Sequence, residues 1–184
     1  MPTVEPQSEL IPDPSAIAAV VAQLVEGTWP GSDAERENLF ERVPFKSGER
    51  LNQGIEGSST TSFALVTELP GISFASWSTY NGKFMSINLH AYSFPEAESR
   101  TTRLGHDAVC GILTDLYGQP TRLLSNEEVP PSTWKVNGRE IDLHFFNRRN
   151  SSLMLSVSDS ELAAATDAEA AHDSNPSVRI EPSH

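Results

Sequence analysis

The sequence predicts an α+β fold in which helices cover one face of an antiparallel sheet of about six strands, in the order ααβββαβββ. Two Asn-Gly pairs, Asn81-Gly82 and Asn137-Gly138, each separate two runs of alternating apolar residues. Such a pair suits a type I′ turn, in which both central residues adopt φ > 0, and therefore indicates a β-hairpin. The amphipathic stretch between the two pairs predicts a helix, so the expected layout is hairpin, helix, hairpin.

Two helices are expected before the first strand. Asp13-Pro14 is typical of a helix start, and apolar residues then recur with helical spacing up to residue 27. After a break at Pro30-Gly31, Ser32 and Glu35 have the spacing of a capping box, in which each side chain satisfies the backbone N–H of the other residue. This pattern predicts a second helix to about residue 42.

The first half of the sheet follows a segment that the sequence leaves open. Residues 44–59 favour a mobile loop and a short edge strand near residues 49–52 about equally, because they are rich in Gly, Ser, Asn and charge. Residues 60–69 predict a strand, and the first hairpin joins 72–80 to 83–92. In its second arm Met85, Ile87, Leu89 and Ala91 have the phase of the core. The opposite phase holds Phe84, Ser86, Asn88, His90 and Tyr92.

One long helix and a second hairpin complete the predicted domain. The helix ends at Tyr117-Gly118, and its expected apolar stripe consists of Leu104, Ala108, Ile112, Leu113 and Leu116. The second hairpin joins residues 133–136 to 140–146, and a last strand covers 152–157. Trp134 shares its phase with Val136 and is expected in the core.

The two ends differ from the middle of the chain in composition. Residues 1–13 hold three acids and no base, and residues 159–184 hold six acids against Arg179. We therefore expect a disordered segment at 1–13, a single α+β domain at 14–158 and a disordered acidic, Ala- and Ser-rich tail at 159–184.

Charge and composition exclude several classes of protein. The net charge of −12 argues against a nucleic-acid surface, which needs clustered cations to displace counterions, and instead suits solubility or a basic partner. The single Cys110 excludes an internal disulfide framework and fits a buried small hydrophobe in a reducing cytoplasm. No stretch approaches the roughly 20 apolar residues of a membrane helix, so we expect no membrane partner and a cytoplasmic location.

The chain carries no recognisable catalytic pattern. It lacks the nucleophile elbow, the Walker loop, the dinucleotide-binding glycines and a Cys-x-x-Cys pair, so we expect no catalytic residue, no cofactor and no metal. One alternative stays open: His90 and His144 are both on the polar phase of a strand. If the two hairpins join in one sheet, both imidazoles would share a surface with Asp142, where a metal site or an acid–base pair could form.

The polar phase of the sheet and the acidic loop after the long helix are the candidate contact surface for a protein partner. Large aromatic side chains are enriched at interface hot spots, and acidic side chains steer the approach of a basic partner. The candidate partner-binding residues are Trp77, Phe84, His90, Tyr92, Glu127, Glu128, Asp142, His144 and Phe146.

A resemblance supports this interpretation. The stretch Asp115-Leu-Tyr-Gly-Gln-Pro, the pair of strands from Trp134 to Leu143 and the strand from Ser152 to Val157 resemble small actinobacterial proteins of uncharacterised function. Some similar small acidic proteins are immunity factors that are encoded beside secreted polymorphic toxins, including NAD-hydrolysing toxins. The resemblance covers about residues 100–158 and carries no active-site residue.

The function that we expect is therefore inhibition of another protein, which is a secreted toxin or effector. Such an inhibitor would cover the active site of its partner with the sheet face or with the loops at 44–59 and 125–131, as a monomer or a homodimer. A small acidic secretion chaperone and an enzyme that depends on a metal or on His90 and His144 are the alternatives. An exposed apolar patch with stable homodimerisation would favour the chaperone, and bound metal would favour the enzyme.

Overall fold

The computed structural model describes residues 9–51, 57–122 and 124–174, which form four helices and eight strands. The helices are α1 Pro14–Val25, α2 Asp33–Arg42, α3 Arg100–Tyr117 and α4 Ser160–Asp173. The strands are β1 Phe45–Arg50, β2 Thr60–Thr67, β3 Ile72–Tyr80, β4 Lys83–Phe94, β5 Thr121–Arg122, β6 Ser132–Val136, β7 Arg139–Asn147 and β8 Ser151–Asp159.

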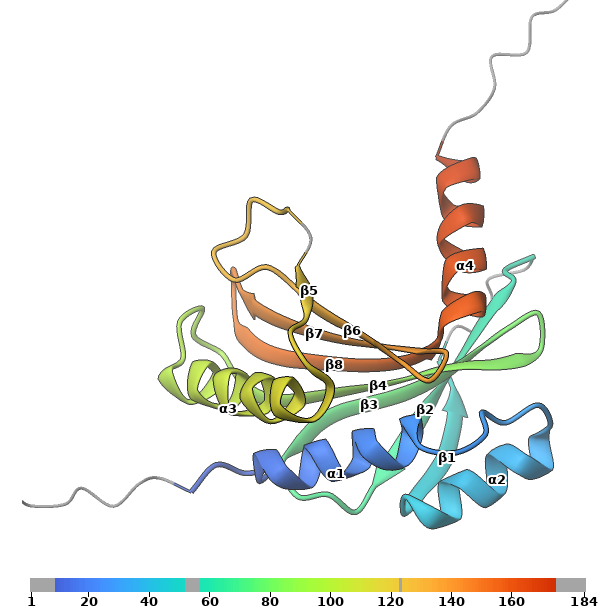
Figure 1. The fold of residues 1–184 in the computed structure, drawn as a ribbon, viewed down its shortest axis with the longest axis horizontal. Coiled ribbons are helices and arrows are strands. Elements are labelled where there is room, and N and C mark those ends of the chain that lie inside the picture. Colours follow the sequence, from blue (N-terminus) through green and yellow to red (C-terminus); the bar gives the residue numbers. More distant parts are fainter. Residues whose placement is uncertain (1–8, 52–56, 123, 175–184) are drawn as a thin grey trace, which may run out of the picture.

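All eight strands belong to one antiparallel sheet in the order β1-β2-β3-β4-β8-β7-β6-β5. The helices α1, α2 and α3 lie on one side of this sheet, and α4 rises from its other side (Figure 1). The predicted α+β class and antiparallel sheet are thus confirmed. The element order is ααββββαββββα, with eight strands where about six were expected. The sequence missed the edge strand β5 and the last helix, and it left the other edge strand, β1, open.

Both Asn-Gly pairs form the turns that the sequence predicts. Asn81 and Gly82 have φ of 48° and 76°, and Asn137 and Gly138 have φ of 53° and 76°. The second turn also holds α1, because the amide of Asn137 donates to the carbonyl of Val25 at 3.0 Å. Free carbonyls at the end of a helix need such donors, so this turn stabilises the end of α1.

The long helix α3 buries a stripe that overlaps the predicted one only in part, because Leu113 is buried and Ala108 and Ile112 are half-buried. Leu104 and Leu116 are exposed, and the buried residues of α3 are Thr102, Gly105, His106, Val109 and Leu113. The reason lies at Gly105, where a Cβ atom would come within 2.4 Å of the ring of Tyr92. The ring of Tyr92 packs directly on the helix backbone, which sets the face that α3 turns to the sheet.

A β-bulge in β4 places Phe84 on the helix side. Ser86 pairs with Ser78 and Phe84 with Thr79, so Met85 is an extra residue in β4. Phe84 is buried and stacks on Trp29 with 4.7 Å between the ring centroids. The sequence placed Phe84 on the face opposite to the core residues of β4, and this prediction is wrong.

A second irregularity turns Tyr92 to the same side. The pairing of β4 with β8 shifts between Ala91 and Phe94, and Tyr92 has a φ of 50°. Its ring is buried, and its hydroxyl donates to the carbonyl of Pro12 at 2.5 Å. Residues 9–13 are therefore described and partly packed, whereas residues 1–8 of the expected disordered segment lie outside the described residues.

Helix α4 corrects the expectation of a disordered segment from residue 159 onward. The carboxylate of Asp159 accepts from the backbone N–H of Glu161 and Leu162 at 3.1 and 3.0 Å, which caps the first turn. The helix then contacts the sheet, since Thr166 bonds to the sulfur of Met85 at 3.2 Å and Ser59 bonds to Glu169 at 2.7 Å. Residues 175–184 of the expected tail lie outside the described residues.

Edge strand β1 answers the question that the sequence left open for residues 44–59. It pairs with β2, and Phe45 is its one buried residue. Residues 52–56 lie outside the described residues. The buried side chains of α1, α2, α3 and the sheet form one core, which contains Trp134 as predicted.

We predict that Gly105→Ala destabilises the protein by about 1–3 kcal/mol, because the added methyl group overpacks the ring of Tyr92. The matched control is Gly111→Ala in the same helix, where a Cβ meets nothing within 4 Å. That change should stabilise the protein by about 0.5–1 kcal/mol, since alanine loses less entropy than glycine in a helix. Urea unfolding of both variants measures the difference, and a Gly105 variant as stable as the control would contradict the packing.

Candidate functional site

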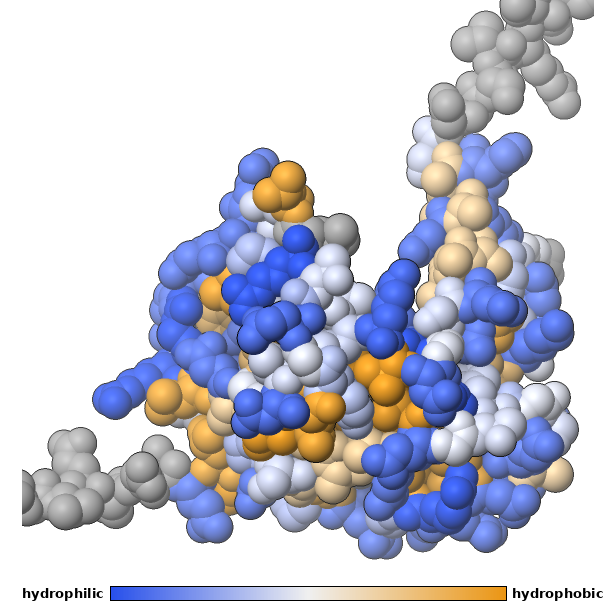
Figure 2. Space-filling model, viewed as in Figure 1, coloured by the Kyte–Doolittle hydropathy of each residue, from blue (hydrophilic) through white to orange (hydrophobic). Residues whose placement is uncertain are grey.

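The open face is the side of the sheet opposite α1, α2 and α3, and its central row runs through Ser76, Asn88, Ser156 and Asp142. These residues are paired in that order across β3, β4, β8 and β7. The two predicted hairpins thus belong to one sheet, joined by β8. Figure 2 shows that the surface on this side is hollowed between α4 and the loop that precedes β6.

His90 and His144 lie on the open face in one row, as the sequence predicts. Met154 of β8 is paired with both of them and separates the two imidazoles. Since neighbouring strands are about 4.8 Å apart, the Cα atoms of the two histidines are about 10 Å from each other. Burial lowers the pKa of His90 below its usual range, so this imidazole is neutral near pH 7.

Exposed apolar side chains extend this row. Phe74 contacts His90 edge-on with 5.6 Å between ring centroids, and Phe146 stacks on His144 at 5.7 Å. The exposed fractions of Val66, Phe74 and Phe146 are 57%, 47% and 40%. An uncovered line of large apolar side chains is typical of a surface that meets another molecule.

Acidic side chains lie on the open face beside the apolar row, toward α4. Burial and the charges of Asp142 and Asp167 raise the pKa of Glu140, whereas Lys135 lowers it. Asp142 accepts from the hydroxyl of Thr133 at 2.6 Å. The strand β7 and the helix α4 thus bring negative charges close together, and each carboxylate disfavours the ionised form of Glu140.

Three of the predicted contact residues do not lie on the open face. Trp77, Phe84 and Tyr92 are exposed by 5%, 6% and 3% and pack on the helix side. The two irregularities in β4 account for Phe84 and Tyr92. For Trp77 the reason is its strand phase, which it shares with Ala75 and its cross-strand partner Ile87, both buried.

The loop residues Glu127 and Glu128 are exposed and take part in ion pairs. Glu128 lies 3.3 Å from Arg103 of α3, and Glu127 lies 4.0 Å from Arg148. The pairs tie the loop to α3 and to the turn after β7. Exposed pairs of this kind contribute little to stability, so both carboxylates remain available to a partner.

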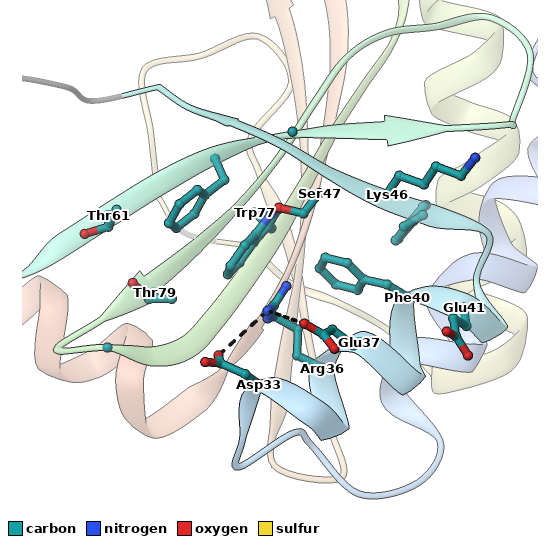
Figure 3. A pocket seen from close by; sticks show the side chains of 14 residues that line it. Asp33, Arg36, Glu37, Phe40, Glu41, Lys46, Ser47, Thr61, Trp77 and Thr79 are labelled. Atoms are coloured by element: carbon teal, nitrogen blue, oxygen red, sulfur yellow. Dashed lines mark hydrogen bonds and ion pairs between the residues drawn. The ribbon is translucent and has the colours of Figure 1, made fainter.

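A second concave surface, the α2 groove, lies on the helix side between α2 and the strands β1, β2 and β3 (Figure 3). It has a volume of about 780 Å³. Its floor is aromatic, because Phe63 stacks on Trp77 at 4.3 Å between ring centroids. Sequence reasoning missed this groove, because it forms only where α2 meets strands that pair in the folded sheet. The spacing of Asp33, Glu37 and Glu41 was the available signal.

A cleft of about 460 Å³ runs beside α3 and is lined by His106, Cys110 and Arg122, among others. Cys110 is partly exposed there, not buried as expected. His106 is exposed by 5%, and its Nδ1 lies 3.0 Å from a carboxylate oxygen of Asp107. Its Nε2 has no hydrogen-bond partner among the described residues. Burial lowers the pKa of His106, and the hydrogen bond to Asp107 offsets only part of that shift.

Comparison with protein-family models, with curated proteins and with solved structures finds no match to this chain. Within the described ranges, no three or more His, Cys, Asp or Glu side chains are grouped so that they could hold a metal ion. No helix in the described part of the chain has the length and apolar character to cross a membrane.

We predict that His106 makes the protein less stable at mildly acidic pH. Below the usual histidine pKa of about 6.5, the unfolded chain binds a proton that the buried imidazole of the folded chain does not bind. The free energy of unfolding therefore decreases as the pH is lowered through this range. Below the lowered pKa of the folded chain, His106 causes no further decrease. Urea unfolding at about pH 7 and about pH 5 should show a smaller loss in His106→Gln than in the wild type. Equal losses would contradict the assignment.

Proposed function

We propose that this protein is a non-catalytic binding protein that inhibits another protein, a toxin or effector, by covering its active site. The observation that supports this most is the exposed apolar row of the open face. Val66, Phe74 and Phe146 stay on the one side of the sheet that α1, α2 and α3 leave uncovered. Large apolar side chains that gather on one uncovered side are typical of a surface that contacts another protein.

The centre of the open face carries small polar side chains. Asn88 and Ser156, which are paired across β4 and β8, are partly exposed, whereas Ser76, Ser78, Ser86 and Ser158 beside them are buried. A centre of small side chains, between α4 and the loop before β6, admits a convex or protruding partner (Figure 2). Shape complementarity then comes from the walls, and binding energy comes from the aromatic side chains at one end.

The charge of the face defines the partner further. Glu140, Asp142 and Asp167 lie near one another, and the whole chain has a net charge of −12. Charge complementarity therefore favours a basic partner, whose approach would be accelerated by the acidic chain. A basic catalytic cleft that binds an anionic substrate fits this description. The inhibitor would act in the cytoplasm, where it protects the cell that makes both proteins.

The test begins with capture of the partner by the tagged full-length protein from its native cells, followed by co-expression with the product of the neighbouring gene. With the purified partner, Phe74→Ser/Phe146→Ser should weaken binding at least about tenfold, because exposed aromatic side chains are typical interface hot spots. The inhibited activity of the partner should return in parallel.

The matched control is Leu104→Ser/Leu116→Ser, which removes two leucines of α3 with exposed fractions of 45% and 55% on the other side of the sheet. This double variant should keep full affinity and full inhibition. The proposal fails if no partner is retained, or if both double variants lose affinity equally.

A further inference from the structure

The α2 groove contains a mostly buried cation, since the side chain of Arg36 is 11% exposed. The guanidinium of Arg36 lies over the ring of Trp77, 4.4 Å from its centroid, and 5.4 Å from that of Phe40. Its Nη2 atom is 3.7 Å from the carboxylates of Asp33 and Glu37, which is too long for hydrogen bonds. Its Nε has no partner among the described residues. The groove therefore accommodates positive charge on an aromatic surface, and its carboxylates keep their hydrogen-bonding capacity.

The ring of Trp77 is fixed by other residues that line the groove. Its Nε1 donates to the hydroxyl of Ser47 at 2.9 Å. Phe63 stacks on the ring with 4.3 Å between centroids, and Phe40 contacts it edge-on at 5.7 Å. Beyond this cluster the floor continues with Thr61 and Thr79, which are paired across β2 and β3. The floor is thus a preformed apolar surface that ends in hydroxyl groups.

Three carboxylates form one wall of the groove. Asp33, Glu37 and Glu41 are four residues apart, so they lie on the same edge of α2, in line with one another (Figure 3). The side chains of Asp33 and Glu37 are exposed by 90% and 70%. At a rise of about 1.5 Å per residue, successive carboxylates of this wall are about 6 Å apart along the helix.

This spacing matches an extended peptide. In a β-strand, side chains on the same side recur about every 6.7 Å, so three alternate side chains span about 13 Å against about 12 Å for the three carboxylates. We propose that the α2 groove binds an extended segment of another protein with Arg or Lys at alternate positions. The basic side chains pair with Asp33, Glu37 and Glu41, and the intervening side chains lie on Phe63, Thr61 and Thr79.

The charged side chains that line the groove make its two ends differ in their attraction for a cation. Lys46 of β1 lines the end near Glu41, so the attraction for a cation is stronger at Asp33 and Glu37 (Figure 3). The groove is on the other side of the sheet from the open face. Its occupant therefore does not depend on the proposed inhibitory function, and the two proposals succeed or fail separately.

The experiment uses the full-length protein and three capped hexapeptides. In the first, Arg and Thr alternate; in the second, the same residues form an Arg block and a Thr block; in the third, Glu replaces Arg in the alternating order. Isothermal titration calorimetry measures affinity, and amide chemical shifts locate the site. We expect the alternating Arg peptide to bind one to one, to shift residues of α2 and β1, and to bind at least about fivefold more tightly than the block peptide. The Glu peptide should not bind.

Two double variants test whether the carboxylates of the groove wall bind the peptide. Glu37→Gln/Glu41→Gln should weaken the alternating peptide about tenfold, because two of three charge pairs are lost. The control Glu68→Gln/Glu96→Gln changes two exposed acids outside the groove by the same charge and should keep the affinity within about twofold. Absence of saturable binding, equal affinity for the alternating and block peptides, or equal losses in both variants would each overturn the proposal.

Discussion

The fold depends on the pairing of β8 with both β4 and β7. These strands come from two hairpins that are separated in sequence by α3, and only β8 joins them. Leu153, Leu155 and Val157 alternate along β8 on the helix side and are almost fully buried. Without this strand, α1 and α3 would lack a continuous surface to cover, and His90 and His144 would belong to separate surfaces.

The two sides of the sheet differ in how completely they are filled. On the helix side, an aromatic cluster of Trp29, Phe40, Trp77 and Phe84 packs in edge-on and stacked contacts around the start of β4. The buried guanidinium of Arg139 bonds to the carbonyl of Gly27 at 2.5 Å and so closes this side near the end of α1. On the open face the central side chains of Ser78, Ser86 and Ser158 are small and buried, whereas Val66, Phe74 and Phe146 stay exposed.

Sequence reasoning reached the elements whose signals are local. The turns at Asn81 and Asn137 follow from the two residues that form them, and the cap at Ser32 follows from its hydroxyl. The facing of Phe84 and Tyr92 could not be predicted in this way, because an inserted residue in a strand shifts the alternation without any mark in composition. Helix α4 was missed because its contacts, such as Ser59 with Glu169, link residues far apart in sequence.

The same limit applies to the candidate sites. His90, Asp142 and His144 were placed on one surface from strand phase alone, and the sheet bears that placement out. The α2 groove was not foreseen, since it forms only when β1, β2 and β3 come together beside α2. Tertiary contacts decide which charged residues of a helix face solvent and which line a groove.

The two outer strands have a consequence for the behaviour of the protein at high concentration. The edge of a sheet offers unpaired backbone groups to other chains, and long apolar edges promote aggregation. At one edge β5 has two residues, and at the other β1 presents Lys46, Glu49 and Arg50. Both edges are thus poor templates for a further strand from an identical copy, which disfavours growth of the sheet from one molecule to the next.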